Sequence, residues 1–162
     1  MKKLLKKVIA AMLCMGLFLV VGCKKDNPVI AGGGIEEPII EISLEYTKWK
    51  AAGIVDAKTG ILTKLRPEDC DMCYTIKFMT DSTFGGKAEN NTYFGKYEFD
   101  TATHTMHISG LSQTFVGSWF DEELYLWSLR DVHSCFIEDN KLQLYFNEDH
   151  YLLFNFVDYE KK

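Results

Sequence analysis

The chain has 162 residues, of which 47% are hydrophobic and 14% aromatic, and its formal net charge is −5 at pH 7. This length allows one globular domain with a substantial core. The acidic balance argues against nucleic acid as a partner, because a phosphate backbone repels a negatively charged surface.

The first 22 residues have the pattern of a secretory signal peptide, which we expect to be removed. Four lysines lie between Lys2 and Lys7, and the apolar run Val8–Val21 follows them. This run holds about 14 residues, whereas a helix that crosses a bilayer needs about 20. An ordinary membrane-anchor helix is therefore the less favoured alternative.

Residues 19–23, with the sequence Leu-Val-Val-Gly-Cys, resemble the lipobox of bacterial lipoproteins. The resemblance implies cleavage before Cys23 and acylation of this cysteine, with palmitate among the acyl chains. Two acyl chains anchor a protein stably where one is marginal. We therefore expect an outer-membrane lipoprotein of the bacterial cell envelope, on either the periplasmic or the outward face.

The chain after the leader is predicted to form a flexible tether and one domain. Removal of the leader takes away four of the 18 basic residues and no acidic residue, which leaves 14 basic against 23 acidic residues and a net charge near −9. Residues 23–38 have the composition of a tether, because Pro28, Gly32–Gly34 and Pro38 occur there with little periodic apolar content. The domain then comprises residues 39–162.

Alternating apolar and polar residues predict eight strands in the domain. They span residues 49–55, 61–65, 74–79, 83–88, 93–99, 105–109, 141–146 and 151–157. The alternation slips near Gly95, which indicates a β-bulge there. A mostly antiparallel set of this size is expected to close, because closure removes exposed strand edges.

One segment, residues 118–130, has helical spacing instead of alternation. Phe120, Leu124 and Trp127 fall at positions i, i+4 and i+7, on one face of the predicted helix. The acidic residues 121–123 and Arg130 suit the two ends of the helix dipole. The predicted fold is therefore mainly β: a single antiparallel, barrel-like domain with one short α-helix near residues 119–130.

Several segments resemble the META domain of heat-inducible, HslJ-like envelope lipoproteins. They are Trp49, Asp81–Ala88, Asn90–Tyr97, Met106–Ile108, Leu142–Tyr145 and Leu152–Phe154. The resemblance covers about residues 49–156 and implies a lipocalin-like β fold. It implies no catalytic residue, because the family has no agreed enzymatic activity and is associated with envelope stress, antibiotic tolerance or motility. The Cys70–Cys73 motif is a departure from the family pattern.

Three thiols remain once the leader is removed and Cys23 is acylated, namely Cys70, Cys73 and Cys135. An oxidising compartment favours a structural disulfide, either between Cys70 and Cys73 or between one of them and Cys135. A bond to Cys135 would close a loop of about 60 residues and stabilise the fold by roughly 3–4 kcal/mol.

Two other uses of these thiols are open. Cys70 and Cys73 have the spacing of a redox-active dithiol, although Asp69 and Asp71 would raise the thiol pKa and a strand follows where a helix is usual. The three thiols and His133 could also supply the four ligands of a structural zinc site. We favour the structural disulfide and expect no metal and no cofactor.

The remaining polar motifs predict no enzyme. The sequence contains no phosphate-binding loop, nucleophile elbow or metalloprotease motif. We expect His104 and His107 at the rim, His150 in an exposed turn, and residues 121–123 as a solvated helix start rather than a calcium site. Asn90–Thr92 has N-glycosylation spacing, and Asp81–Thr83 and Asp100–Ala102 resemble O-glycosylation acceptors of some bacterial envelopes.

The predicted function is a non-catalytic interaction or stress-associated role for a monomeric, lipid-anchored envelope protein. One alternative is a lipocalin-like carrier of a small apolar ligand, although we expect side chains to fill the barrel. The aromatic residues that could line such a cavity are Tyr74, Tyr93, Phe94, Phe115, Trp119, Trp127, Phe136 and Phe154. Further alternatives are a thiol oxidoreductase that uses Cys70 and Cys73, and a subunit of a surface glycan-uptake or adhesion assembly.

Overall fold

The structure is a computed structural model that describes residues 43–118 and 120–159. All of these residues fall in one compact unit, Ile40–Lys162. The predicted signal peptide (1–22), the acylation site Cys23 and the tether (23–38) lie outside the described residues. Among the described residues, no helix is long and apolar enough to cross a membrane.

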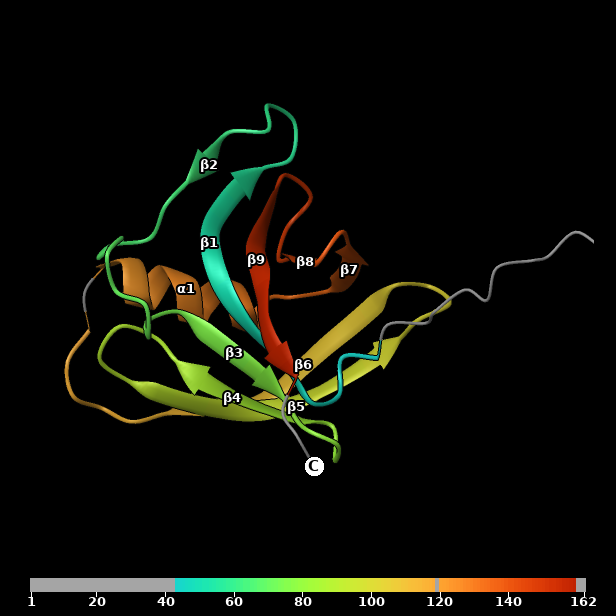
Figure 1. Cartoon of the computed structure of the whole chain (residues 1–162), viewed down its shortest axis with the longest axis horizontal. Helices are drawn as coiled ribbons and strands as arrows, with labels where there is room; N and C mark the ends of the chain where they lie inside the picture. The colour runs from blue at the N-terminus through green and yellow to red at the C-terminus, as the bar shows by residue number, and fades with distance from the viewer. Residues whose placement is uncertain (1–42, 119, 160–162) are drawn as a thin grey trace, which may run out of the picture. The chain divides into compact units, whose positions relative to one another are not determined.

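Nine strands and one helix make up the described chain (Figure 1). The elements are β1 (Thr47–Asp56), β2 (Leu62–Thr63), β3 (Thr75–Phe78), β4 (Thr83–Lys87), β5 (Thr92–Asp100), β6 (Thr105–Gln113), α1 (Phe120–Arg130), β7 (Ser134–Glu138), β8 (Lys141–Tyr145) and β9 (His150–Tyr159). The mainly β fold with one short helix is therefore confirmed. The strand β7 is additional to the eight predicted ranges.

The strands form a closed ring of antiparallel pairs. Their order is β2-β1-β3-β4-β5-β6-β7-β8-β9, and β9 also pairs with β1, so that of the strands in the described residues β2 alone stays outside the ring. β1 and β9 pair along their whole length, from Thr47 opposite Tyr159 to Asp56 opposite His150. By contrast, β6 and β7 share the single pair Thr105 and Ser134. This ring of pairings is compatible with the predicted barrel-like domain.

Period-two alternation explains why β5 is a strand with one face in the core. Tyr93 and Tyr97 are buried, while Phe94 and Lys96 point outward. The predicted bulge is confirmed, because the pairing with β6 shifts register between Phe94 and Lys96. A Cβ at Gly95 would lie 2.9 Å from the Phe84 ring, so only glycine allows this close approach.

Aromatic rings fill the inside of the ring of strands. Tyr125 of α1 packs against Tyr74, Tyr93 and Phe154, with ring centroids 5.2, 5.9 and 6.3 Å away. The Tyr125 hydroxyl lies 2.7 Å from the Tyr93 hydroxyl, which itself donates to the Thr75 carbonyl. Both buried hydroxyl groups are therefore paired, as burial of polar groups requires. The contacts between strands and helix thus form one aromatic core.

The helix α1 lies where the sequence predicts it, but its buried face is different. Trp127, on the apolar face that defines the helical spacing, is 56% exposed, and Leu124 is only half buried. The face against the core carries instead Asp121, Glu122, Tyr125, Leu126, Ser128 and Leu129. The side chain of Phe120 lies outside the described part of the chain. Polar residues occupy this face because distant loops supply their hydrogen-bond partners.

Candidate functional site

Three loops and the first turn of α1 meet at one end of the domain, which we call the loop end. The loops are residues 64–74 between β2 and β3, residues 88–91 between β4 and β5, and residues 114–118 between β6 and α1. Figure 1 shows the start of α1 beside the first and the last of these loops. Two buried carboxylates of α1 join them.

Glu122 fixes the turn between β4 and β5. Its side chain has no exposed surface, and its carboxylate accepts hydrogen bonds from the backbone N–H of Asn91 at 2.9 Å and of Asn90 at 3.4 Å. A carboxylate in the first turn also suits the positive end of the helix dipole. The prediction of a solvated helix start was therefore wrong for Glu122. The partners lie more than 30 residues away in the chain, so local sequence gives no sign of them.

Asp121 fixes the loop before β3. Its carboxylate accepts hydrogen bonds from Arg66, from the backbone N–H at 2.8 Å, from Nε at 2.8 Å and from an Nη at 3.0 Å. These hydrogen bonds lower the pKa of Asp121. Asp121 is buried as well, so it too departs from the predicted solvated helix start. The Tyr74 hydroxyl donates to the Arg66 carbonyl and ties the same loop to the aromatic core.

Asn91 fixes the loop between β6 and α1. Its buried side chain accepts from the Val116 N–H at 2.9 Å and from the Thr114 hydroxyl, and it donates to the Gly117 carbonyl. The loop therefore holds a defined conformation although its tip is apolar and exposed. Phe115 is 94% exposed and Val116 is 74% exposed.

The loop before β3 contains the disulfide bond. Cys70 is bonded to Cys73, one of the pairings that the sequence left open, while Cys135 is a free, buried thiol. The Lys50 ammonium group donates to the carbonyls of both Cys70 and Cys73, and burial lowers its pKa. Met72, inside the disulfide loop, is 60% exposed. A third apolar side chain, after Phe115 and Val116, is thus exposed at the loop end.

The four candidate zinc ligands are not brought together in the described part of the chain. Among the described residues, no group of three or more His, Cys, Asp or Glu side chains could hold a metal ion. Cys70 and Cys73 are bonded to each other, and burial raises the pKa of the Cys135 thiol to about 12. His133 is exposed and contacts the Ser134 hydroxyl instead.

The loop end is acidic. Asp69, Asp71 and Glu123 are exposed there, and Glu89 is half buried. One Glu89 carboxylate oxygen is buried with no hydrogen-bond partner among the described residues. Burial, with the nearby carboxylates of Glu122 and Asp121, raises the pKa of Glu89. The exposed apolar tips therefore have negatively charged surroundings.

The eight aromatic residues considered for a ligand cavity do not line one space. Tyr74, Tyr93 and Phe154 are buried in the core, whereas Phe94, Phe115, Trp127 and Phe136 are exposed on different elements. Trp119 lies outside the described residues. Of the histidines, His104 and His107 are exposed as predicted, and His104 stacks on Phe136. His150 is half buried at the start of β9, not in an exposed turn.

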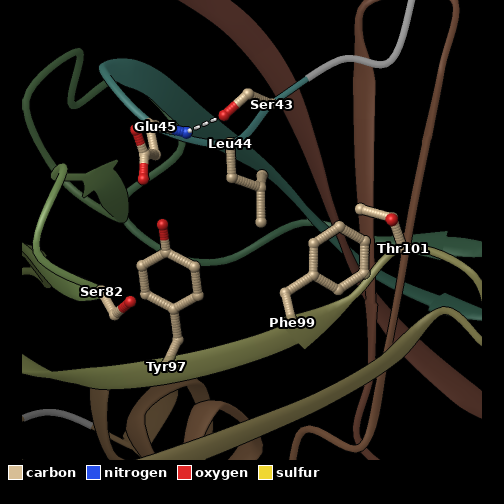
Figure 2. Close-up of a pocket in the computed structure, with 7 residues that line it drawn as sticks. All are labelled: Ser43, Leu44, Glu45, Ser82, Tyr97, Phe99 and Thr101. Carbon is tan, nitrogen blue, oxygen red and sulfur yellow. Dashed lines mark hydrogen bonds between the residues drawn. The ribbon is translucent and has the colours of Figure 1, made fainter.

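A hollow of about 360 Å³ lies at the opposite end of β5 from the loop end (Figure 2). Its lining consists of Ser43, Leu44, Glu45, Ser82, Tyr97, Phe99 and Thr101. β5 connects the two ends: Thr92 bonds to Thr114 at the loop end, and Asp100 leads into Thr101 at the hollow. Nine residues of strand span about 30 Å. Ser43, where the described chain begins, is therefore far from the loop end.

Fold and site together define a small antiparallel β domain that has an aromatic interior and a fixed, partly apolar loop end. No protein-family model matches the chain. A protein of Tannerella forsythia, named as a candidate lipoprotein, is 29% identical over 126 residues, which are 72% of this chain and 78% of that protein.

Two solved structures share the fold. A DUF4847 family protein from Bacteroides vulgatus has a TM-score of 0.56 at 16% identity. The matched region is 69% of this chain and 93% of that protein. A protein from Burkholderia xenovorans, solved by NMR, has a TM-score of 0.58 at 18% identity. The matched region is 70% of this chain and 83% of that protein. At these identities the similarity shows the fold alone.

Proposed function

We propose that this protein is a lipid-anchored bacterial envelope protein whose domain binds another envelope protein and catalyses no reaction. The anchor rests on the leader and the lipobox-like segment that ends at Cys23. The relative from Tannerella forsythia, with its lipoprotein name, supports the same reading. We propose further that the protein is attached to the outer membrane, is monomeric and belongs to the META family.

The fixed loop end is the observation that carries the binding role. Phe115, Val116 and Met72 are exposed at the same end of the domain, and exposed apolar side chains that gather in one region mark interaction sites. Here Asn91 and the disulfide loop hold them in place, so little conformational entropy is lost when a partner binds. Aromatic residues and Met are also enriched in protein interfaces.

The charge at the loop end indicates the chemistry of the partner. Asp69, Asp71, Glu89 and Glu123 lie on the elements of the loop end. Its cations Arg66 and Lys64 are already paired, with Asp121 and Glu68 respectively. A complementary surface has an apolar pocket for Phe115 and basic residues around it. An anionic membrane surface lacks that complementarity.

Acylation is tested by labelling cells with radioactive palmitate. We expect label on the wild-type protein and none on Cys23→Ala. Label that persists in Cys23→Ala, or is absent from the wild type, contradicts the anchor.

The binding role is tested by photocross-linking in intact cells. p-Benzoylphenylalanine is placed at residue 115 or 72, and at Ile61 as the control, since Ile61 is 64% exposed on another loop. We expect one discrete cross-linked partner from residues 115 and 72 and none from 61, and mass spectrometry should map its contact to a basic surface. No cross-link from the loop end, or equal yields from all three sites, contradicts the proposal.

The thiol oxidoreductase alternative uses the same disulfide and stays a proposal of its own. Cys70 and Cys73 have the Cys-x-x-Cys spacing that this chemistry needs. However, the strand β3 follows them where a helix is usual, and Cys73 is buried. Titration of the reduced pair separates the two readings. A thiol pKa clearly below the free value of about 8.5 favours the oxidoreductase.

A further inference from the structure

Two residue pairs in the sequence share a feature found nowhere else in the chain. An aspartate directly precedes a serine or threonine only at Asp81-Ser82 and Asp100-Thr101. The first lies in the turn between β3 and β4, and in the second Asp100 ends β5 and Thr101 begins the turn to β6. Nearly 20 residues separate them in the sequence.

The fold brings both hydroxyl residues to one hollow. Ser82 and Thr101 lie on opposite sides of the 360 Å³ hollow, and Tyr97 and Phe99 rise from β5 between them (Figure 2). The backbone N–H of Tyr97 donates to the Ser82 carbonyl at 2.8 Å, which sets this turn against β5. The two turns thus border one shared space with an aromatic floor.

Both turns contain the same aspartate hydrogen bond, although their backbones differ, because Ser82 has a left-handed φ of 59° and Thr101 does not. Asp81 Oδ1 accepts from the Thr83 N–H at 3.2 Å, and Asp100 Oδ1 accepts from the Ala102 N–H at 2.9 Å. Each aspartate thereby bonds past the intervening residue, whose side chain is exposed. Neither the Ser82 nor the Thr101 hydroxyl hydrogen-bonds to another described residue.

We propose that Ser82 and Thr101 are attachment sites for O-linked glycans and that the hollow between them accommodates the first sugars against Tyr97 and Phe99. Hollows of about 300 Å³ and more are large enough for small ligands. The proposal rests on export to the envelope, which is part of the proposed function above.

The chemistry is a glycosyl transfer with this chain as acceptor. The co-reactant is a sugar joined through its anomeric carbon to a phosphate or pyrophosphate carrier, and a separate transferase catalyses the step. The Ser or Thr hydroxyl oxygen forms a bond to the anomeric carbon. The bond from that carbon to the phosphate oxygen breaks, the carrier leaves with the electron pair, and the hydroxyl proton passes to a base of the transferase.

The test is mass spectrometry of the full-length protein purified from the envelope of its own bacterium. Peptide mapping with electron-transfer fragmentation is expected to place hexose-type mass additions on Ser82, Thr101 or both. Ser82→Gly tolerates the left-handed φ of 59° at this position and, like Thr101→Ala, should remove the addition at its site. Asp81→Asn and Asp100→Asn should reduce it, while Ser112→Ala should leave it unchanged.

Bare hydroxyls at both sites overturn the inference, and so does a sugar found only on Asn90 or another residue. The mass of the N-terminal peptide in the same sample reports acylation of Cys23. An acylated protein with bare hydroxyls therefore refutes the glycan sites alone, whereas an unacylated protein refutes the proposed anchor.

Discussion

Glu122 shows how a single side chain can organise a loop far from it in sequence. Its buried carboxylate accepts two backbone N–H groups of the turn between β4 and β5. Its neighbour Glu123 is exposed, and its one hydrogen bond within the described part of the chain is from the Ser118 hydroxyl. Adjacent glutamates of one helix turn therefore have opposite roles, one structural and one at the surface.

Glu122→Ala is expected to destabilise the domain strongly. It leaves two amides without their acceptor, and an unsatisfied buried group costs about 1–3 kcal/mol. Glu123→Ala, the matched control, should change the free energy of unfolding by less than about 0.5 kcal/mol. Urea unfolding followed by circular dichroism measures both, and equal effects of the two variants would contradict the assignment.

The Arg66–Asp121 contact predicts a response to acid. Hydrogen bonds from Arg66 lower the pKa of Asp121 below its ordinary 3.8 in the folded state. A carboxyl group of this kind stabilises the fold above its unfolded pKa and loses that contribution as pH falls through the folded pKa. The wild type should therefore be more stable than Asp121→Asn by a constant margin above about pH 5, and the margin should shrink below pH 4. Thermal unfolding from pH 3 to pH 7 measures it, and a margin that grows in acid would rule out this explanation.

The disulfide bond closes a much shorter loop than a bond to Cys135 would have closed. The bond joins residues only three apart, so it closes a loop of four residues. Such a short loop restricts the unfolded chain little, and chain-entropy arithmetic gives about 2 kcal/mol.

Replacing both Cys70 and Cys73 by Ser should therefore cost about 2 kcal/mol or less. Reductant should destabilise the wild type by a similar amount and leave the double variant unaffected. Chemical unfolding with and without dithiothreitol is the measurement. A loss near the 4 kcal/mol of a long loop would instead indicate pairing with Cys135.

Comparison of elements shows how far the sequence alone could lead. Strands such as β5 were predictable because alternation is local, and Gly95 marked its bulge. The position of α1 was predictable for the same reason, but its buried face was not. Asp121 is satisfied by Arg66, 55 residues away, and hydrophobic spacing alone favoured Trp127. The loop end escaped prediction because Asn91, a polar residue in a turn, gives no sign that it holds Phe115 outward.

At the scale of the whole molecule, the ring of strands has one short seam. Between β6 and β7 there is one residue pair, flanked by the bonds Met106 N–H to the His133 carbonyl and Cys135 N–H to the His104 carbonyl. On the other side of the ring, β1 and β9 pair over ten-residue strands. Openings with few hydrogen bonds to break have low free energies. We therefore expect the ring to open first between β6 and β7.

Hydrogen–deuterium exchange should reveal this difference. Peptides that contain residues 104–108 and 133–136 are expected to exchange before those with residues 150–157, under native conditions. Exchange is followed by mass spectrometry at fixed pH, and peptides from exposed loops give the upper limit of the exchange rate. Slower exchange at the seam than in β9 would show that α1 protects it.

Cys135 lies on this seam, and its thiol is fully buried with a pKa raised to about 12. An alkylating reagent can reach the sulfur only in molecules whose ring has parted, and the closed form supplies almost no thiolate at neutral pH. The alkylation rate of Cys135 therefore reports how often the ring opens between β6 and β7. This natural cysteine makes the opening measurable without an engineered probe.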